Sequence, residues 1–302
     1  KRIHCRTTCH VHYDRRKRLI MKYVLGDNFV SYFVSYILGL KLVKYKSLED
    51  LDLNHGQDAI PPNLLEVCKK LFSDCVVLEY ERFYDDRGKC TSNRPINGND
   101  PEKSYEILFD KIKESVNKNC IDETLVRIDL GGKLVFSDRS IEFDRLISTI
   151  NIVDLVELDN SGKIRQSIVE NNKLDGFHLP HNDKFTYICK LRSEEDKILS
   201  GIYKQILATG RPYFRKTYVE DHVFYDCMRN IYDDKIEGNE VVEYIETTQI
   251  SDNLDIKKVM GIDMVGKFAQ WKEGVNLETI YNDCQELKEF YESSEKNHKK
   301  VF

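Results

Sequence analysis

The sequence predicts an α/β fold in which a parallel-sheet domain, assembled from both ends of the chain, carries a second, β-rich domain. Two observations favour this fold class. A strand-like run, an apolar helix-like run and a second strand-like run follow one another within residues 22–45, which is the order of a βαβ unit. Near the other end, the strand-like run 259–266 precedes a helical pattern that begins near Asn276. The length of 302 residues leaves room for two such domains.

The first 75 residues contain the clearest local signals. Residues 22–26 form a short β-type run that ends at Gly26, residues 29–38 are apolar, and residues 40–45 alternate like a second strand. Residues 61–72 place two prolines in the first turn of an amphipathic pattern, where a helix tolerates them. We therefore expect strand, helix, strand and a further helix in this part of the chain.

The middle of the chain alternates between turn signals and apolar runs, and its elements follow from that alternation. In order, we expect an extended segment at 76–84, a helix at 104–117, a hairpin of strands 125–130 and 133–136 joined by a Gly-Gly turn, an apolar stretch from 143, and strand-like, aromatic residues over 156–255.

The domain assignment follows from this order of elements. We predict a basic extension at 1–20, a nucleotide-binding domain made of 21–75, 120–155 and 256–302, and a substrate or cap domain made of 76–119 and 156–255.

Charge is unevenly distributed along the chain. Residues 1–20 hold seven Lys or Arg and one acid, whereas the remaining residues carry a net charge of −11. An acidic body argues against general binding of nucleic acid, which requires a broad basic surface. The run from Arg15 to Arg18 is typical of a solvated flank, with nucleic-acid contact as the alternative. Because Met21 opens a pattern typical of a protein start, we treat residues 1–20 as an extension outside the ancestral fold.

The nine cysteines are widely spread and include no C-x-x-C pair, and the first twenty residues lack an apolar signal segment. These features are typical of a reducing compartment, so we expect a cytoplasmic protein. The longest uncharged run, 28–40, is shorter than the ~20 residues that a membrane span needs. Cys5, Cys9, His10 and His12 do not have a common structural zinc spacing, and we predict no metal site.

The turn after the first strand has the position, and part of the sequence, of a dinucleotide-binding fingerprint. That fingerprint places glycine at three positions, which correspond here to Gly26, Asn28 and Ser31. Ser31 is small enough for close packing between helix and strand, whereas Asn28 brings a side chain toward the expected pyrophosphate. Lys-Tyr-Lys at 44–46 stands where an acid would bind the ribose. From these residues alone, a βαβ unit without a nucleotide is an equal alternative.

The C-terminal part supplies a second strand–turn–helix segment. Gly266 and Lys267 follow the strand-like run, Trp271 comes next, and the last helix begins near Asn276. Helix N-termini present N–H groups and a partial positive charge, which suit a pyrophosphate or an anionic ring. The alternative is a packing unit in which Trp271 belongs to the core.

Three stretches together resemble the glutathione-reductase-type flavoproteins, the group that contains UDP-galactopyranose mutase, protoporphyrinogen oxidase and the amine oxidases. They are the N-terminal βαβ unit, the hairpin and return strand of 125–150, and the segment 265–272 before the last helix. The strand 211–218 is similar to the substrate-domain strand of the mutase-like members. The resemblance covers most of residues 21–295 and implies a discontinuous, Rossmann-like domain of the FAD/NAD-binding type with a β-rich substrate domain.

This resemblance implies FAD as the cofactor. The residues that it implies for the cofactor site are Gly26, Asn28, Ser31, Gly266, Lys267 and Trp271. The first three would contact the pyrophosphate, the next two the phosphate–ribityl portion, and the last the ring or its helix. The residues that it implies for the substrate face are Arg211, Tyr213, Arg215, Tyr218, Arg229 and Tyr232.

Arg and Tyr together suit a small, nucleotide-linked or phosphorylated substrate, because guanidinium groups match phosphate and phenols stack or donate. An alternating strand with Arg outward and Tyr inward is the alternative for these residues. No catalytic residue is assigned.

Several departures from the family leave two hypotheses about function. Two fingerprint glycines, the ribose-binding acid and a Gly-Gly doublet after the second strand are missing, and Lys267 replaces an arginine. The first hypothesis is a flavin-dependent oxidoreductase or mutase-like protein that acts on a small substrate. The second is a non-catalytic protein of the same fold that binds a nucleotide or a protein partner without flavin. Hydrolase and kinase motifs are absent from the sequence.

Overall fold

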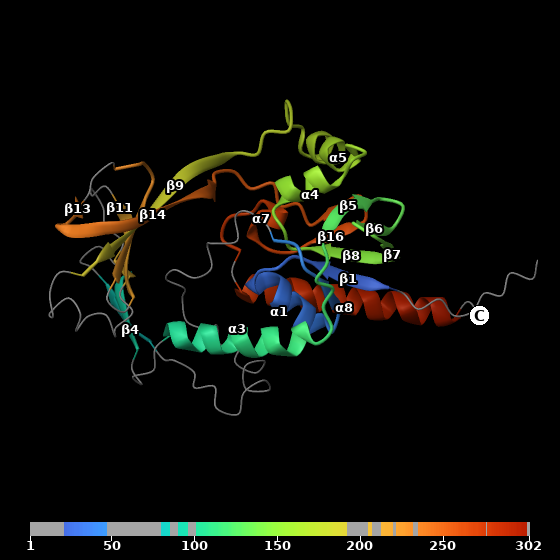
Figure 1. Cartoon of the computed structure of the whole chain (residues 1–302), viewed down its shortest axis with the longest axis horizontal. Helices are drawn as coiled ribbons and strands as arrows, with labels where there is room; N and C mark the ends of the chain where they lie inside the picture. The colour runs from blue at the N-terminus through green and yellow to red at the C-terminus, as the bar shows by residue number, and fades with distance from the viewer. Residues whose placement is uncertain are drawn as a thin grey trace, which may run out of the picture.

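A five-stranded sheet in the order β15-β16-β8-β1-β2 forms the middle layer of the helix-covered part of the structure, on the right in Figure 1. The computed structural model describes residues 21–46, 80–84, 90–95, 101–191, 205–206, 213–219, 222–231, 235–275 and 277–300. The strands of the sheet are β1 (Lys22–Leu25), β2 (Lys41–Val43), β8 (Arg145–Ser148), β15 (Lys258–Val259) and β16 (Ile262–Met264). All neighbours pair in parallel except β15 with β16. The sheet thus combines segments from both ends and the middle of the chain, which confirms the predicted fold class.

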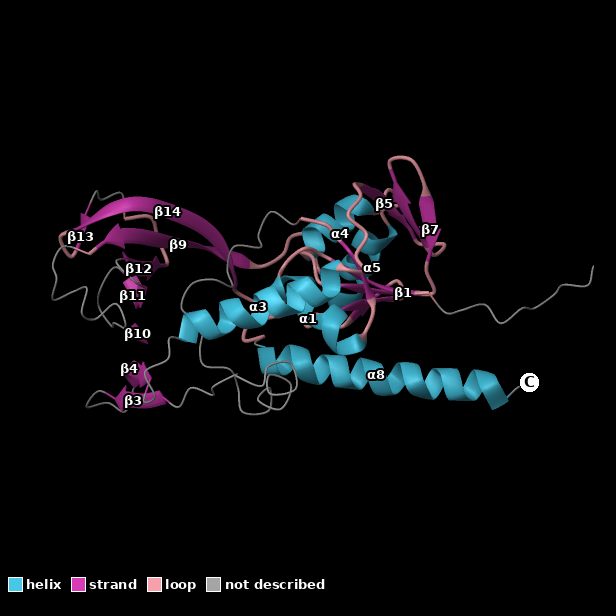
Figure 2. Ribbon diagram, turned by 60° about the horizontal axis from the view of Figure 1, so that its bottom comes forward, coloured by secondary structure: helices cyan, strands magenta, loops and turns pink. Residues whose placement is uncertain are grey.

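Three helices cover one face of this sheet, and smaller elements cover the other (Figure 2). The first face carries α1 (Phe29–Leu38), α3 (Pro101–Asn117) and α8 (Leu277–Lys300). The second carries α4 (Ile152–Leu158), α5 (Lys163–Asn172), α7 (Lys267–Gln270) and a three-stranded sheet of β5 (Leu125–Asp129), β6 (Lys133–Phe136) and β7 (Ser140–Glu142). Alternate residues of β1 enter the two cores, because side chains alternate along a strand: Tyr23 and Leu25 on one side, Val24 on the other. We call this layered unit the body.

A six-stranded antiparallel sheet forms the second, β-rich part of the structure, in the order β10-β11-β12-β9-β14-β13. Its strands are β9 (His181–Lys190), β10 (Gln205–Ile206), β11 (Tyr213–Val219), β12 (His222–Cys227), β13 (Lys235–Ile236) and β14 (Asn239–Ile250). A hairpin of β3 (Tyr80–Tyr84) and β4 (Cys90–Pro95) forms a separate two-stranded sheet. The long strands β9 and β14 extend from the body to the rest of this sheet (Figure 1).

Most predicted elements are present, and the largest difference concerns the residues after β8. The βαβ unit, the hairpin at 125–136, α3 and the last helix are confirmed. Residues expected to be strand-like from 156 onward instead continue α4 and form α5. Asp159 accepts hydrogen bonds from the N–H groups of Ser161 and Ile164, and the second of these satisfies an N–H group in the first turn of α5.

Ile164 and Ile168, one helical turn apart, bury the inner face of α5 in the body, whereas its other residues are polar or partly exposed. By its packing, α3 also belongs to the body, through Ile112 and Val116. The predicted domain boundaries instead place both helices in the substrate domain. The expected helix at 61–72 lies outside the described residues. None of the helices in the described ranges combines the length and apolar character that a membrane crossing requires.

Candidate functional site

The four parallel strands end at one edge of the five-stranded sheet. The register aligns Leu25 of β1 with Val43 of β2 and with Ser148 of β8, and it aligns Ser148 with Met264 of β16. The segments that follow these strands therefore leave the sheet at the same level. In open α/β sheets, ligands bind outside this end of the strands. We call it the carboxyl edge.

Gly26, the first residue after β1, lies where three segments meet at the carboxyl edge. Its N–H donates to the carbonyl of Val43 at 3.0 Å, and its φ is 150°. A Cβ at this position would lie 2.4 Å from Thr149 Oγ1 and 2.9 Å from Ser31 Cβ. The close approach of α1 and of the segment after β8 therefore requires a residue without a side chain.

Asn28 and Ser31 close the N-terminus of α1 through reciprocal hydrogen bonds. The Ser31 N–H donates to Asn28 Oδ1, and the Asn28 N–H donates to Ser31 Oγ, both at 2.9 Å. This capping box accounts for polar residues at the second and third fingerprint positions. The Asn28 side chain folds onto its own helix, and it takes one of the amides that an anion at this terminus would use.

The C-terminal motif meets α1 at the same edge. Gly266 is buried at a φ of 107°, and a Cβ there would lie 3.3 Å from Val30 Cγ1 in the first turn of α1. Lys267 begins α7, with its Nζ 3.2 Å from Glu273 Oε2 and 5.3 Å from the centre of the Phe268 ring. Gly26 and Gly266, predicted as cofactor residues, thus lie against the same helical turn.

A charged pair lies at the end of β2, where the fingerprint has a single acid. Lys44 Nζ donates to Asp122 Oδ2 at 2.7 Å, and this hydrogen bond raises the pKa of Lys44. Asp122 reaches this position because Ile121 forms a parallel bridge with Val43. A carboxylate is therefore present beside β2, but it comes from a segment 78 residues farther along the chain. No local sequence pattern indicates that bridge, so Asp122 was not among the predicted site residues.

A second carboxylate lies in the turn itself. Asp27 Oδ1 accepts a hydrogen bond from the Tyr32 hydroxyl at 2.9 Å. Burial and this hydrogen bond raise the pKa of Tyr32 well above its usual value. The phenol therefore remains a neutral donor over the whole physiological pH range.

Two adjacent hydroxyl groups at the end of β8 differ in their partners. Thr149 Oγ1 donates to the carbonyl of Leu25 at 2.8 Å. Ser148 Oγ is fully buried, and it has no hydrogen-bond partner in the part of the chain that the structure describes. An unpaired buried hydroxyl costs about 1–3 kcal/mol, so Ser148 is a group to which a bound molecule can supply the missing partner. Ser148 was not among the predicted site residues.

Trp271 has a different setting from the other cofactor candidates. It is 2% exposed and packs in the core of the body, and its indole Nε1 donates to the carbonyl of Pro180 at 3.1 Å. The indole N–H therefore reaches the segment that leads into β9.

Tyr213, predicted to face the substrate, is buried in the apolar core of the six-stranded sheet. Its hydroxyl donates to Glu237 Oε1 at 2.6 Å, and its ring packs edge-on against Tyr225 at a centroid distance of 4.9 Å. Its contacts are therefore those of a core tyrosine.

Arg215 stands opposite Asp226 in the register between β11 and β12. Asp226 is 3% exposed, accepts a hydrogen bond from Thr186 Oγ1 at 2.5 Å, and lies 3.6 Å from Lys184 Nζ. The register therefore places Arg215 across from Asp226, a buried polar residue that was not among the predicted site residues. Of the other candidates, Tyr218 lies on β11, Arg229 is exposed after β12, and Arg211 and Tyr232 lie outside the described residues.

The parallel sheet, its layers and the second sheet define the class of fold: a Rossmann-like α/β domain with a second, β-rich domain. No protein-family model and no curated protein matches the sequence. Solved structures do match. They include p-nitrophenol 4-monooxygenase PnpA from Pseudomonas putida DLL-E4 (TM-score 0.53, 11% identity, 90% of this chain and 79% of that one). They also include BrvH, a flavin-dependent halogenase from Brevundimonas sp. BAL3 (0.53, 10%, 91% and 72%), and reduced UDP-galactopyranose mutase (0.52, 10%, 87% and 91%). The chain shares the fold of these proteins.

The contacts of Gly26 predict a specific loss of stability on substitution. Gly26→Ala forces a Cβ against Thr149 and Ser31, so the free energy of unfolding should fall by about 2–4 kcal/mol in denaturant titrations. Gly39, which ends α1 at a φ of 63°, is the matched control, because a Cβ there would meet nothing within 4 Å. Gly39→Ala should cost only about 1 kcal/mol. Equal losses in the two variants would contradict the close approach at Gly26.

The two hydroxyls at the end of β8 predict opposite responses to their removal. Ser148→Ala should leave the free energy of unfolding of the ligand-free protein unchanged or raise it, because no hydrogen bond is lost. Thr149→Val should lower it by about 1 kcal/mol, because the carbonyl of Leu25 loses a donor. Thermal and denaturant unfolding without added ligand measure both. A loss in Ser148→Ala as large as that in Thr149→Val would contradict the unpaired state of Ser148.

Proposed function

We propose that this chain is a flavin-dependent oxidoreductase or mutase-like protein that holds FAD at the carboxyl edge. The observation that carries the proposal is the contact of Gly266 with the first turn of α1, beside Gly26. Two segments from opposite parts of the chain thus leave backbone without side chains beside one helix N-terminus. Such a terminus stabilises a pyrophosphate, and the absence of side chains lets it come close.

The residues at this edge fit the parts of FAD in order. The first turn of α1 and Gly26 would hold the pyrophosphate, with Lys267 adding positive charge on the side of Gly266. Asp122, beside the end of β2, would accept from the ribose hydroxyls, in the role that the fingerprint assigns to an acid there. The buried hydroxyl of Ser148 would gain a partner. FAD would supply the redox chemistry when bound, and the chain would bind and orient it.

For the substrate, we propose only a chemical class. The structural neighbours include a monooxygenase, a flavin-dependent halogenase and UDP-galactopyranose mutase, so the fold supports flavin chemistry without selecting one substrate. The arginines of β11 and of the loop after β12 support a small molecule that carries phosphate, such as a nucleotide-linked one. A protein of this fold that binds a nucleotide or a partner without flavin is the alternative outcome of the test.

Cofactor binding is tested by titrating the purified chain with FAD and following flavin absorbance and fluorescence. We expect saturable binding, and we expect Lys267→Ala to weaken it about fivefold or more, because a positive charge near the phosphates is lost. Lys163→Ala, which removes an exposed lysine at the start of α5, is the matched control and should bind FAD like the wild type. A colourless preparation that does not take up added FAD would contradict the proposal. Unchanged FAD affinity in Lys267→Ala would show that Lys267 is not part of the site.

The cap of α1 provides a second test of where the pyrophosphate lies. Asn28→Gly frees the Ser31 N–H at a cost in stability of only a few tenths of a kcal/mol, so FAD affinity should rise about two- to fivefold. Asn28→Asp keeps a cap but adds negative charge, so affinity should fall. The two variants are compared by the same titration. The reverse order of affinities would show that the pyrophosphate does not bind at α1.

A further inference from the structure

Two chain segments connect the body with the six-stranded sheet within the described range 178–256. Residues 178–181 lead into β9, and residues 250–256 lead away from β14 (Figure 1). They run side by side, because Ile250 pairs with His181 and the Ser251 N–H donates to the carbonyl of Pro180 at 3.2 Å. We call this place the crossing.

The segment around α7 binds both sides of the crossing. In the segment that leads away from β14, the N–H groups of Leu254 and Ile256 donate to the carbonyls of Trp271 and Gln270, at 3.0 and 2.9 Å. In the segment that leads into β9, the carbonyl of Pro180 accepts a hydrogen bond from Trp271 Nε1 at 3.1 Å. In the described residues, the indole N–H is thus the link from α7 to the start of β9.

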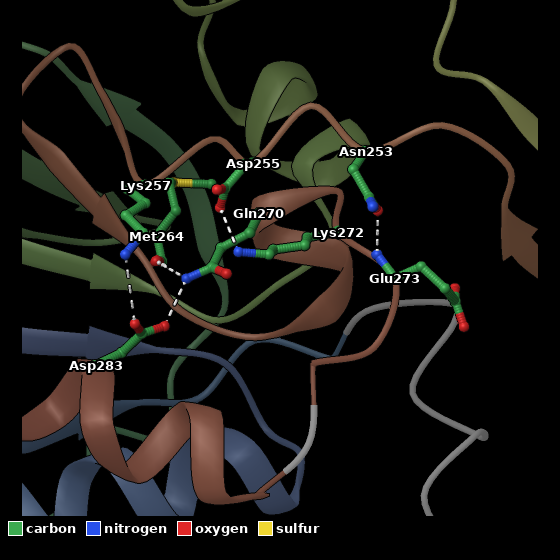
Figure 3. A network of polar contacts seen from close by, with 8 residues as sticks. All are labelled: Asn253, Asp255, Lys257, Met264, Gln270, Lys272, Glu273 and Asp283. Carbon is green, nitrogen blue, oxygen red and sulfur yellow. Dashed lines mark hydrogen bonds and ion pairs between the residues drawn. The ribbon is translucent and has the colours of Figure 1, made fainter.

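Surface contacts reinforce the segment of the crossing that leads away from β14 (Figure 3). Lys272 Nζ lies 3.0 Å from Asp255 Oδ1, and the Glu273 N–H donates to Asn253 Oδ1 at 2.5 Å. The residues that follow Trp271 therefore hold the chain that returns from β14 at two further points.

The same segment is anchored in the body at its other end. Gln270 is 1% exposed, and its Nε2 donates to the carbonyl of Met264 at 2.9 Å and to Asp283 Oδ2 of α8 at 2.7 Å (Figure 3). Its backbone N–H donates to the carbonyl of Gly266 at 2.9 Å. A continuous set of hydrogen bonds therefore runs from Gly266 at the carboxyl edge through Gln270 and Trp271 to the crossing.

We propose that Trp271 is a positioning residue, which couples a cofactor bound at Gly266 and Lys267 to the placement of the six-stranded sheet. The inference rests on the proposed function, since it needs a cofactor at the carboxyl edge. A molecule that binds one segment makes local opening of that segment less favourable, and the effect extends to whatever the segment holds. Trp271 carries this effect to Pro180, which leads into the sheet proposed to face the substrate.

The backbone of Trp271 supports a role beyond filling the core. It has a φ of 49°, which is uncommon for a bulky residue and is kept only where the surroundings demand it. In this conformation Trp271 ends α7, and its own N–H donates to the carbonyl of Lys267. The turn and the indole hydrogen bond together connect a cofactor residue with the crossing over a span of five residues.

Hydrogen exchange of the full chain, with and without saturating FAD, tests the coupling. In the wild type, FAD should slow exchange about fivefold at Ser251 and at the first amides of β9. Trp271→Phe keeps an aromatic ring but loses the donor, so this slowing should fall to about twofold or less. The slowing at Leu254 and Ile256 should remain, because they bond to the backbone of α7. A merely structural role of the ring would not separate Ser251 and the first amides of β9 from Leu254 and Ile256.

Tyr291→Phe is the matched control, because it also removes one buried aromatic donor, to Asp263 Oδ2 at 2.8 Å, away from the crossing. It should show the wild-type slowing at every amide. Should Trp271→Phe fail to fold, the sulfur analogue of tryptophan, benzothienylalanine, removes the N–H with nearly the same ring volume. Since Trp271 is the one tryptophan of the chain, the analogue changes only this residue.

The outcomes separate the inference from the proposed function. Full FAD-dependent slowing at the start of β9 in Trp271→Phe or in the analogue protein would overturn the role of the indole N–H. FAD binding without any slowing in the wild type would overturn the coupling and leave the cofactor proposal standing. Absence of FAD binding in the absorbance titration would overturn both.

Discussion

The close packing around Gly26 is the constraint on which the rest of the structure depends. The turn after β1 has Thr149 on one side and Ser31 on the other, with distances that leave no room for a Cβ. This contact sets α1 directly behind the end of β1 and brings the end of β8 beside it. The same placement exposes the first turn of α1 to Gly266. Because glycine has no side chain, Gly26 lets these segments meet closely. Their meeting point defines the carboxyl edge, where a ligand can bind.

The chain uses the start of α1 differently from a glycine-rich fingerprint. Asn28 satisfies one helix amide itself, which stabilises the start of the helix but would compete with an anion for the same N–H. At the end of β2, where the fingerprint has one acid, Lys44 and Asp122 form an ion pair that carries no net charge. In both places, a side chain of the protein makes a contact that a bound ligand could make instead. Gly26 and Gly266, the glycines that permit close approach, are present, so the edge has this close-packed geometry without the complete fingerprint sequence.

The sequence carried enough information for the elements whose signals are local, and too little for those defined by distant partners. The βαβ unit was predictable because a glycine turn and an apolar helix follow a strand within 25 residues, and the Gly131-Gly132 turn identified the hairpin. Helix α5 was missed because only Ile164 and Ile168 are buried in it, and two apolar positions do not define a helical period. Asp122 could not be found, since its place beside Lys44 depends on a single bridge between Ile121 and Val43.

Trp271 shows how a motif can be located correctly from sequence while the direction of its side chain depends on long-range packing. Its neighbours Gly266 and Lys267 lie at the carboxyl edge, as the order of segments predicts, but the indole is directed at Pro180, 91 residues away in sequence. Because α7 has only four residues, a group bound at its start and the indole at its end are joined by a single turn with little freedom to move apart. The geometry of that turn is the reason why we expect the carboxyl edge and the crossing to respond together when a cofactor binds.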